Sequence, residues 1–344
     1  MTSDGENTLT GRRHSLLLAA VSEFIATAEP VGSNQIASRH HLGIKSAMVR
    51  NMMSELEEAG FLSQPHTSAG RIPTDKAFRY YVDHLAGARI GFEDRSQIEL
   101  HYSGRGRDLA LLMRDTPKLL SILTGQAAMV MAPRIESVEL ERVNFIRIRE
   151  REVLAVFVST NGAVQNRLII TDREHTQGEF DRMAAYLNDS LGGRTLDEAR
   201  EWIAAQLKLE RARYDRFVRD ALVLGEAIAG HPEVIEVYID GSVQALEQPE
   251  FSDPGKVREL LRALDDKSAL LELLERSIGQ QGVMVSIGSE NPRLSGFAVV
   301  AASYDGGAKP LGSLAIVGPV RMDYERVIPL VEYTARALSK ILEH

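Results

Sequence analysis

The sequence predicts a multidomain α+β protein: an N-terminal winged helix-turn-helix, then an α+β sheet domain interrupted by an inserted, mainly helical segment. Three observations support this prediction. Residues 12–85 combine short helical patterns with a hairpin punctuated by Gly and Pro. Strand-like patterns then occur in two separate blocks, 126–171 and 283–318. Between these blocks the period is helical, which is typical of a sheet domain split by an insertion.

The first two N-terminal helices are defined by an apolar stripe and by their end signals. The first helix ends at Pro30 and carries apolar residues at helical spacing, namely Leu16, Leu17, Ala20, Val21, Phe24 and Ile25. The second helix is short and runs from Ser33 to about His40. Ser33 is predicted to be its N-cap, because a serine hydroxyl can accept a hydrogen bond from an orphan backbone amide.

The third helix is predicted to begin at Ser46, a second N-cap, and to end at Gly60. Its inner face holds Val49, Met52 or Met53, and Leu56. Its outer face, near the N-terminal end, holds Lys45, Ser46, Arg50 and Asn51. This arrangement predicts a helix-turn-helix, in which the first turns of the second helix of the motif enter the major groove of DNA.

The segment 61–73 is predicted to form a wing of two short strands around a turn containing Pro65 and Gly70. Thr74 is predicted to cap the next helix, whose apolar face packs the wing against the module. That face consists of Phe78, Tyr81, Val82 and Leu85.

Charge favours a nucleic-acid partner for this module and for no other part of the chain. Nine Lys/Arg and nine Asp/Glu lie in residues 1–90, which leaves 31 basic and 39 acidic residues in the remainder. Acids are absent from residues 30–54 and 59–74. One neutral-to-positive face is what a polyphosphate requires. The alternative is a plain three-helix bundle with solvated bases.

The remainder divides into a helical connector, 91–125, a sheet domain formed by 126–171 and 248–344, and an insertion, 172–247. The pair Asn161-Gly162 predicts a hairpin between two strands of the sheet. The insertion contains a long helical pattern from about Thr195 to Ala229, which carries Trp202. This helix is expected to be either an oligomerisation surface or part of the insertion's own core.

The sequence contains no signature of an enzyme. GxxxxGK[ST], GxSxG and HExxH are absent, and no GxGxxG follows a strand. We therefore expect no catalytic residue, no cofactor and no metal. The absence of Cys excludes disulfides and thiolate sites. No apolar run approaches the roughly 18 residues that span a bilayer, and residues 1–10 are polar, so we expect a cytoplasmic protein.

Several motifs resemble one family along nearly the whole chain. They are RRHSLLLAAVSEFIATAEPVGS (12–33), VRNMMSELEEAGFL (49–62), PHTSAGRIPTDKAFRYYVDHL (65–85), FVSTNGAVQNRLI (157–169), IGSENPRLSGFAVVAASY (287–304) and GPVRMDYERVIPLVEY (318–333). With these motifs the chain resembles the HrcA family of bacterial heat-inducible transcription repressors. The sequence departs from the expected family pattern at Lys45 and Met48, where small hydroxyl residues are expected at the start of the recognition helix.

The resemblance implies a winged helix, a GAF-like domain and an inserted dimerising domain. It implies a homodimer that represses chaperone operons (chaperonin and DnaK-type) at an inverted-repeat operator and is kept active by the GroE chaperonin. Arg71 and the wing are expected to contact phosphate or the minor groove. The full set expected at the DNA is Ser33, Asn34, Lys45, Ser46, Met48, Arg50, Asn51, His66, Thr67, Ser68 and Arg71.

Two other functions fit the same pattern. In the first, the protein is a winged-helix regulator whose GAF-like domain senses a small molecule in a pocket between sheet and helices. In the second, it is a structural or interaction protein without DNA activity. Calorimetry with nucleotides tests the first alternative, and a gel shift with operator DNA at two salt concentrations tests the second.

Overall fold

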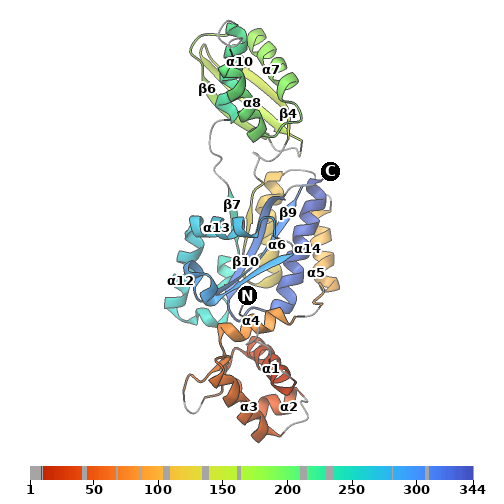
Figure 1. The fold of residues 1–344 in the computed structure, drawn as a ribbon, viewed down its shortest axis with the longest axis vertical. Helices are drawn as coiled ribbons and strands as arrows, with labels where there is room; N and C mark the ends of the chain where they lie inside the picture. Colours follow the sequence, from red (N-terminus) through yellow and green to blue (C-terminus); the bar gives the residue numbers. More distant parts are fainter. Residues whose placement is uncertain are drawn as a thin grey trace.

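The computed structural model has three bodies that follow one another along the long axis of the molecule (Figure 1). We call them the N-terminal module (residues 9–85), the sheet domain (87–133 and 236–343) and the inserted domain (139–229). The described residues are 9, 11–40, 45–66, 69–85, 87–103, 109–133, 139–160, 164–209, 215–229, 236–280, 282–306 and 310–343.

The N-terminal module is helical with one short hairpin. Its elements are α1 (Arg12–Thr27), α2 (Ser33–Arg39), α3 (Ser46–Glu58), β1 (Leu62–Ser63), β2 (Ile72–Pro73) and α4 (Asp75–Asp83). The helices share one core, which buries the apolar stripe predicted for α3 and that predicted for α1, except that Phe24 and Ile25 of α1 are partly buried. β1 pairs antiparallel with β2. The chain before α2 pairs with the base of the hairpin through Val31 and Arg71, whose amides and carbonyls exchange two 2.9 Å hydrogen bonds.

The sheet domain contains a five-stranded antiparallel sheet in the order β7-β3-β10-β9-β8. The strands are β3 (Ala127–Met131), β7 (Val237–Asp240), β8 (Val283–Ile287), β9 (Phe297–Asp305) and β10 (Pro310–Pro319). The helices are α5 (Phe92–Tyr102), α6 (Leu109–Thr124), α11 (Ser242–Ala245), η2 (Pro249–Ser252), α12 (Pro254–Asp265), α13 (Lys267–Ser277), η3 (Gly288–Glu290), η4 (Pro292–Leu294) and α14 (Tyr324–Leu342).

Both faces of this sheet are covered, so its strands are apolar on both sides. In β9, Val300 lies in a core shared with α6 and α14, whereas the adjacent Val299 lies in a core shared with α12 and α13. Alternate side chains of a strand point to opposite faces, which explains this division. No helix within the described ranges is long and apolar enough to cross a bilayer.

The prediction that residues 91–125 form a connector outside the sheet domain is wrong. Its two helices belong to the sheet domain, because α6 packs on β3 and α5 packs on α14. Leu112, Leu119 and Leu120 of α6 are buried in the same core as the sheet.

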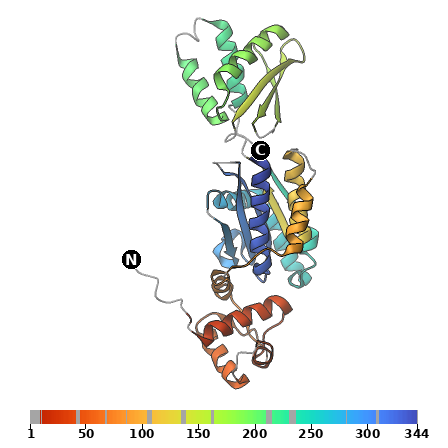
Figure 2. The same ribbon diagram turned by 90° about the vertical axis from the view of Figure 1, so that its right-hand side faces the viewer.

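The inserted domain is a mixed body with a three-stranded antiparallel sheet in the order β4-β5-β6. Its elements are β4 (Leu140–Arg147), β5 (Glu152–Ser159), β6 (Val164–Ile170), α7 (Gln177–Leu191), α8 (Leu196–Lys208) and α10 (Arg216–Ala229). The helices lie on one side of the strands and leave the other side bare (Figure 2). The domain is therefore not mainly helical, contrary to the expectation.

Two further sequence-based boundaries are wrong. The strands expected within 126–171 do not form one sheet, because β3 pairs with β10 whereas β4, β5 and β6 pair only among themselves in the described chain. β7, placed in the insertion by the sequence, pairs with β3 at the edge of the larger sheet. Apolar alternation identifies a strand but does not specify its partner. The insertion therefore begins before β4, not after β6.

The single long helix predicted from Thr195 to Ala229 is instead at least two helices. α8 ends at Lys208, where Leu209 is extended, and α10 runs from Arg216 to Ala229. The two helices pack against each other on the small sheet. Their apolar residues therefore form the domain's own core.

Candidate nucleic-acid interface

The inner face of α3 anchors this helix in the N-terminal module. Val49, Met52, Met53 and Leu56 are buried, as the period predicted. They pack with α1 and α2 in the core of the module. A helix held by one apolar stripe presents its opposite face to solvent.

The outer face of α3 carries unpaired polar side chains. Lys45, Met48, Arg50 and Asn51 are exposed, and Met48 is 48% exposed. Among the residues that the structure describes, no ion pair or side-chain hydrogen bond engages Lys45, Arg50 or Asn51. The first acidic residue of α3 is Glu55, which pairs with Arg13 of α1 at 2.6 Å. The N-terminal half of α3 is therefore a positive face available to an anion.

Three predicted site residues meet where α2 and α3 begin. The Ser46 hydroxyl donates to Asn34 Oδ1, and the Ser33 and Ser46 hydroxyl oxygens lie 3.4 Å apart. The prediction that the two serines are N-caps is wrong. The N-caps are Gly32 and Lys45, and neither uses its side chain to cap. The serine hydroxyls tie the two helices together instead of closing the helix ends.

A buried carboxylate that sequence reasoning missed holds α2 against α1. Glu23 of α1 is buried and accepts from Gln35 Nε2 at 2.6 Å, Arg39 Nη1 at 2.5 Å and His40 Nε2 at 3.1 Å. Burial alone raises the pKa of Glu23, but hydrogen bonds from these three side chains outweigh burial and lower it. The available signal was an acid within the apolar stripe of α1.

Arg71 occupies a different place from the one expected. Its Nε donates to Glu57 Oε2 at 2.8 Å and its Nη2 donates to Ser54 Oγ at 2.8 Å. The Arg71 side chain is only 14% exposed. Its guanidinium therefore joins the hairpin to the last turns of α3. The expected contact of Arg71 with phosphate or the minor groove stays a prediction, and the guanidinium already uses its Nε and Nη2 within the module.

The hairpin lies against the segment that precedes α2. A Cβ on Gly70 would lie 2.7 Å from backbone atoms of Pro30 and Val31, so only glycine allows this approach. His66 is exposed at the outer end of the hairpin. Thr67 and Ser68, the other predicted wing contacts, lie outside the described residues.

An open cleft of about 750 Å³ lies at the side of the module, between α1, α4 and the start of α14. Its polar lining includes His14, His40, His84, Arg89 and Glu325. The His14 Nδ1 and Tyr80 hydroxyl atoms are 2.8 Å apart. Within the described ranges, no group of three or more His, Asp or Glu side chains is arranged to hold a metal ion.

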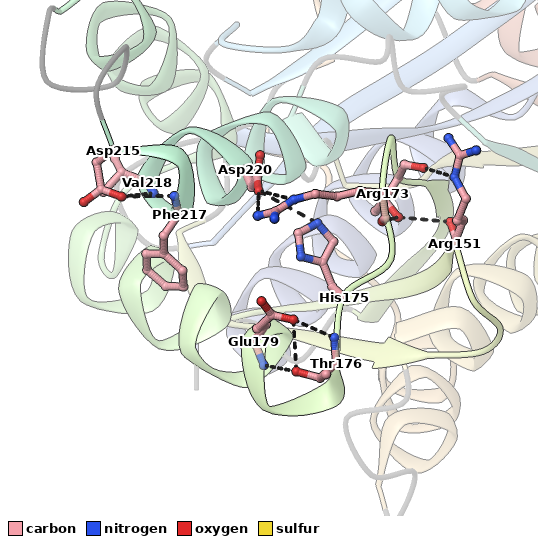
Figure 3. Close-up of polar contacts among 10 residues, drawn as sticks. Arg151, Arg173, His175, Thr176, Glu179, Asp215, Phe217, Val218 and Asp220 are labelled. Carbon is pink, nitrogen blue, oxygen red and sulfur yellow. Dashed lines mark hydrogen bonds and ion pairs between the residues drawn. The ribbon is translucent and has the colours of Figure 1, made fainter.

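On the helical side of the inserted domain, polar contacts join elements of the domain to one another (Figure 3). Arg173 Nε donates to Asp220 Oδ2 at 3.0 Å, which ties the chain before α7 to α10. His175 Nε2 lies 3.9 Å from the same carboxylate oxygen. Thr176 and Glu179 form a capping box at the start of α7. These contacts are internal to the domain.

The outer face of the small sheet is uncovered in the described chain and carries many apolar side chains, with Arg142, Asn144, Glu152 and Asn166 among them. Ile170 is 74% exposed and Leu168 is 56% exposed, and neighbouring strands add further apolar side chains on the same face. The large exposed apolar residues of this sheet are Ile146, Val164, Leu168 and Ile170, with Ile148 at the end of β4. A group of exposed apolar side chains bordered by polar ones is typical of an interaction surface.

Comparison with known proteins gives consistent results over the whole chain. A family profile described as "HrcA protein C terminal domain" matches residues 111–328. The heat-inducible transcription repressor HrcA of Geobacter sulfurreducens is 40% identical and covers 97% of this chain and 98% of its own length. The Sorangium cellulosum repressor of the same name is 39% identical with the same two coverages. A crystal structure described only as a hypothetical protein has a TM-score of 0.66 at 26% identity and covers 98% of this chain and 99% of its own.

Proposed function

The chain belongs to the HrcA family of heat-inducible transcription repressors, and we propose that it represses transcription by binding double-stranded operator DNA through its N-terminal module. The family predicted from the motifs is confirmed, since curated relatives are 32–40% identical over nearly the full chain. The observation that carries the DNA proposal is the exposed, uncompensated face of α3.

In this proposal, α3 is the recognition helix of a winged helix and its N-terminal half enters the major groove. Arg50 is placed to read guanine and Asn51 to read adenine, the base edges that these side chains match in bidentate pairs. Lys45 contacts phosphate, and Met48 offers an apolar contact to a thymine methyl.

The other predicted residues divide into contact and positioning roles. His66, with Thr67 and Ser68, is proposed to contact the backbone beside the half-site. Ser33, Asn34 and Ser46 set the angle between α2 and α3 through their hydrogen bonds. Arg71 positions the wing on α3 instead of contacting DNA, because its guanidinium is already engaged.

The outer face of β4, β5 and β6 is proposed as the homodimer interface. The helices of the inserted domain use their apolar stripes internally, whereas this sheet face has no partner within the described chain. A self-complementary apolar face pairs about a two-fold axis. The dimer then presents two N-terminal modules, which match an inverted-repeat operator.

We also propose, from the family resemblance, that the sheet domain is GAF-like and that the GroE chaperonin keeps the repressor active. Heat diverts chaperonin to unfolded clients, which lowers the supply of active repressor and releases the chaperone operons. The multidomain organisation of the chain supports this dependence: the inserted domain has its own core, and the N-terminal module shares a core with one face of the sheet domain. Such chains populate aggregation-prone intermediates.

A gel shift tests the function directly. The full chain is titrated onto promoter DNA from chaperonin and DnaK-type operons, and onto scrambled DNA of the same length, at two salt concentrations. We expect operator binding at least roughly 1,000-fold tighter than binding to scrambled DNA, with both weakening as salt rises. Equal affinity for both DNAs at both salt concentrations would refute repression at a specific operator.

Ligand sensing stays an alternative because of the cleft beside α1 and α4. Three histidines and Arg89 line it, which suits a small anion, and the cleft adjoins the DNA-binding module. It lies outside the region between sheet and helices where the sequence placed a sensor. Calorimetry with a nucleotide panel, repeated with Arg89→Ala, tests this alternative. Binding heat that the variant abolishes would favour it.

A further inference from the structure

Helix α4 connects the N-terminal module to the sheet domain and contacts both (Figure 1). Its Phe78 ring lies 6.3 Å from Phe24 of α1 and 6.2 Å from Tyr324 of α14. The same aromatic side chain is therefore part of both packing arrangements. Polar contacts on either side of Phe78 then determine how the module is oriented.

The first polar anchor joins α4 to β8 and the turn that follows it. Arg79 Nε donates to Glu290 Oε1 at 2.7 Å, and its Nη2 donates to Glu290 Oε2 at 2.5 Å and to the Val285 carbonyl at 2.6 Å. The Ser289 amide donates to Asp75 Oδ2 at 2.9 Å. Arginine holds a carboxylate at two atoms, so this anchor restricts rotation as well as distance.

Gly288 allows the turn to approach α4 this closely. Its φ is +52°, and a Cβ at this position would lie 2.2 Å from Asp75 Oδ2. A side chain here would displace the Asp75 carboxylate from the Ser289 amide, and the positive φ of this residue favours glycine. This explains a glycine in the IGSENPR segment in physical terms.

Two more anchors join the N-terminal module to the chain around the start of α14. The Tyr81 hydroxyl donates to Glu325 Oε1 at 2.7 Å. Arg321 Nη1 donates to the Ile25 carbonyl at the end of α1 at 2.5 Å, while its Nε is held by Glu250 at 2.5 Å. Three anchors at separate places fix the orientation of the N-terminal module relative to the sheet domain, whereas a single anchor would allow the module to rotate about it.

We propose that these three anchors form a clamp that fixes the angle of α3 relative to the sheet domain, and that Asp75, Arg79 and Gly288 are positioning residues for operator recognition. This inference rests on the proposed DNA-binding function. In a dimer, a fixed angle fixes the separation of the two recognition helices. One base pair of extra spacing moves a half-site by about 3.4 Å and turns it by about a tenth of a turn. A dimer with a rigid clamp therefore binds tightly only to operators with one spacing between the half-sites.

The first test measures operator spacing. Inverted repeats whose central spacer is lengthened or shortened by single base pairs are titrated with the wild type, Arg79→Ala and Gly288→Ala. We expect the wild type to lose roughly tenfold in affinity for each altered base pair, and the variants to lose little. Binding to a single half-site is expected to be unchanged in all three proteins.

Matched controls separate positioning from general damage. Arg276→Ala removes an exposed 2.6 Å ion pair with Glu272 on α13, away from the module, and is expected to keep the wild-type spacing profile. The double exchange Arg79→Glu with Glu290→Arg is expected to restore part of the spacing preference that Arg79→Ala loses. Identical spacing profiles for Arg79→Ala and wild type would overturn the proposal.

The second test does not depend on DNA. Because the chain has no Cys, labels on Glu58→Cys and Lys267→Cys report one defined distance between α3 and α13. Labelled chains are diluted in unlabelled chains, and the distance distribution is measured by electron spin resonance. We expect a narrow distribution in the parent and a broad one with Arg79→Ala. A narrow distribution in the variant overturns the clamp even if no operator is bound.

Discussion

Replacing Leu168 with serine provides a sharp test of the proposed dimer interface. Leu168 lies on the outer face of β6 and is 56% exposed. Burying a whole leucine side chain is worth about 1.5–3 kcal/mol. Covering the exposed share in a dimer therefore contributes about 1 kcal/mol from each protomer, and two-fold symmetry makes this about 2 kcal/mol for the complex.

We therefore expect Leu168→Ser to weaken the dimer about 30-fold, as measured by sedimentation equilibrium. Ile122→Ser is the matched control. Ile122 is also apolar and is 61% exposed, but it lies on α6 of the sheet domain. Its replacement is expected to leave the dimer unchanged. An unchanged dissociation constant for Leu168→Ser, or an equal loss in Ile122→Ser, would refute the assignment to the small sheet.

Three other predictions concern reading, stability and heat. Arg50→Ala is expected to cost about 1–3 kcal/mol of binding free energy on operator DNA and little on random DNA, as measured by gel shift. Equal losses on both DNAs would make Arg50 a phosphate contact. No loss on either DNA would refute the placement of α3 in the major groove. The folded-state pKa of Glu23 lies below its ordinary 4.5, so its stabilisation is present above about pH 4.5 and is lost as pH falls through the lower value. Glu23→Gln is expected to speed hydrogen exchange in α1 and α2 at neutral pH, with a difference from wild type that shrinks in acid. Repressor warmed without chaperonin is expected to lose operator binding with light scattering and to regain it with chaperonin and ATP, whereas full recovery on cooling alone would favour an intrinsic thermometer.

The organisation of the N-terminal module could be predicted because its signals are local. The spacing of Val49, Met53 and Leu56 determines which face of α3 is buried, and the same spacing puts Arg50 and Asn51 on the opposite face. Helical period acts over a few residues, so the sequence shows it directly. The structure confirms this face, while its contact with bases stays a prediction.

Contacts between distant elements could not be predicted. The strand pattern around Val153 and Phe157 was recognised, but the pattern is equally compatible with either sheet. The charge of Arg71 suggested phosphate, whereas Glu57 and Ser54 lie within its reach only after α3 and the hairpin have packed. Partner choice depends on tertiary packing, which periodicity does not report.

The attachment of the inserted domain has a consequence for folding kinetics. The chain leaves the sheet domain after β3 and returns at β7, and these neighbouring strands are joined at their ends by the Ala132 amide, which donates to the Glu236 carbonyl at 2.8 Å. Closing so long an unstructured loop costs more entropy than closing one already compacted. An inserted domain that folds first brings the two ends together.

Folding of the inserted domain brings β3 close to β7 but does not bring β3 close to β10. β3 and β10 are far apart in the sequence, yet they pair; Val130, for example, pairs with Leu314. Pairings of high sequence separation form slowly, and until they form the strands and their apolar faces stay open to other chains. From this strand order we expect closure of the sheet domain to be the slow step in reaching the native state. If the proposed dependence on chaperonin holds, slow closure of this sheet lengthens the time during which the chaperonin can bind the open strands.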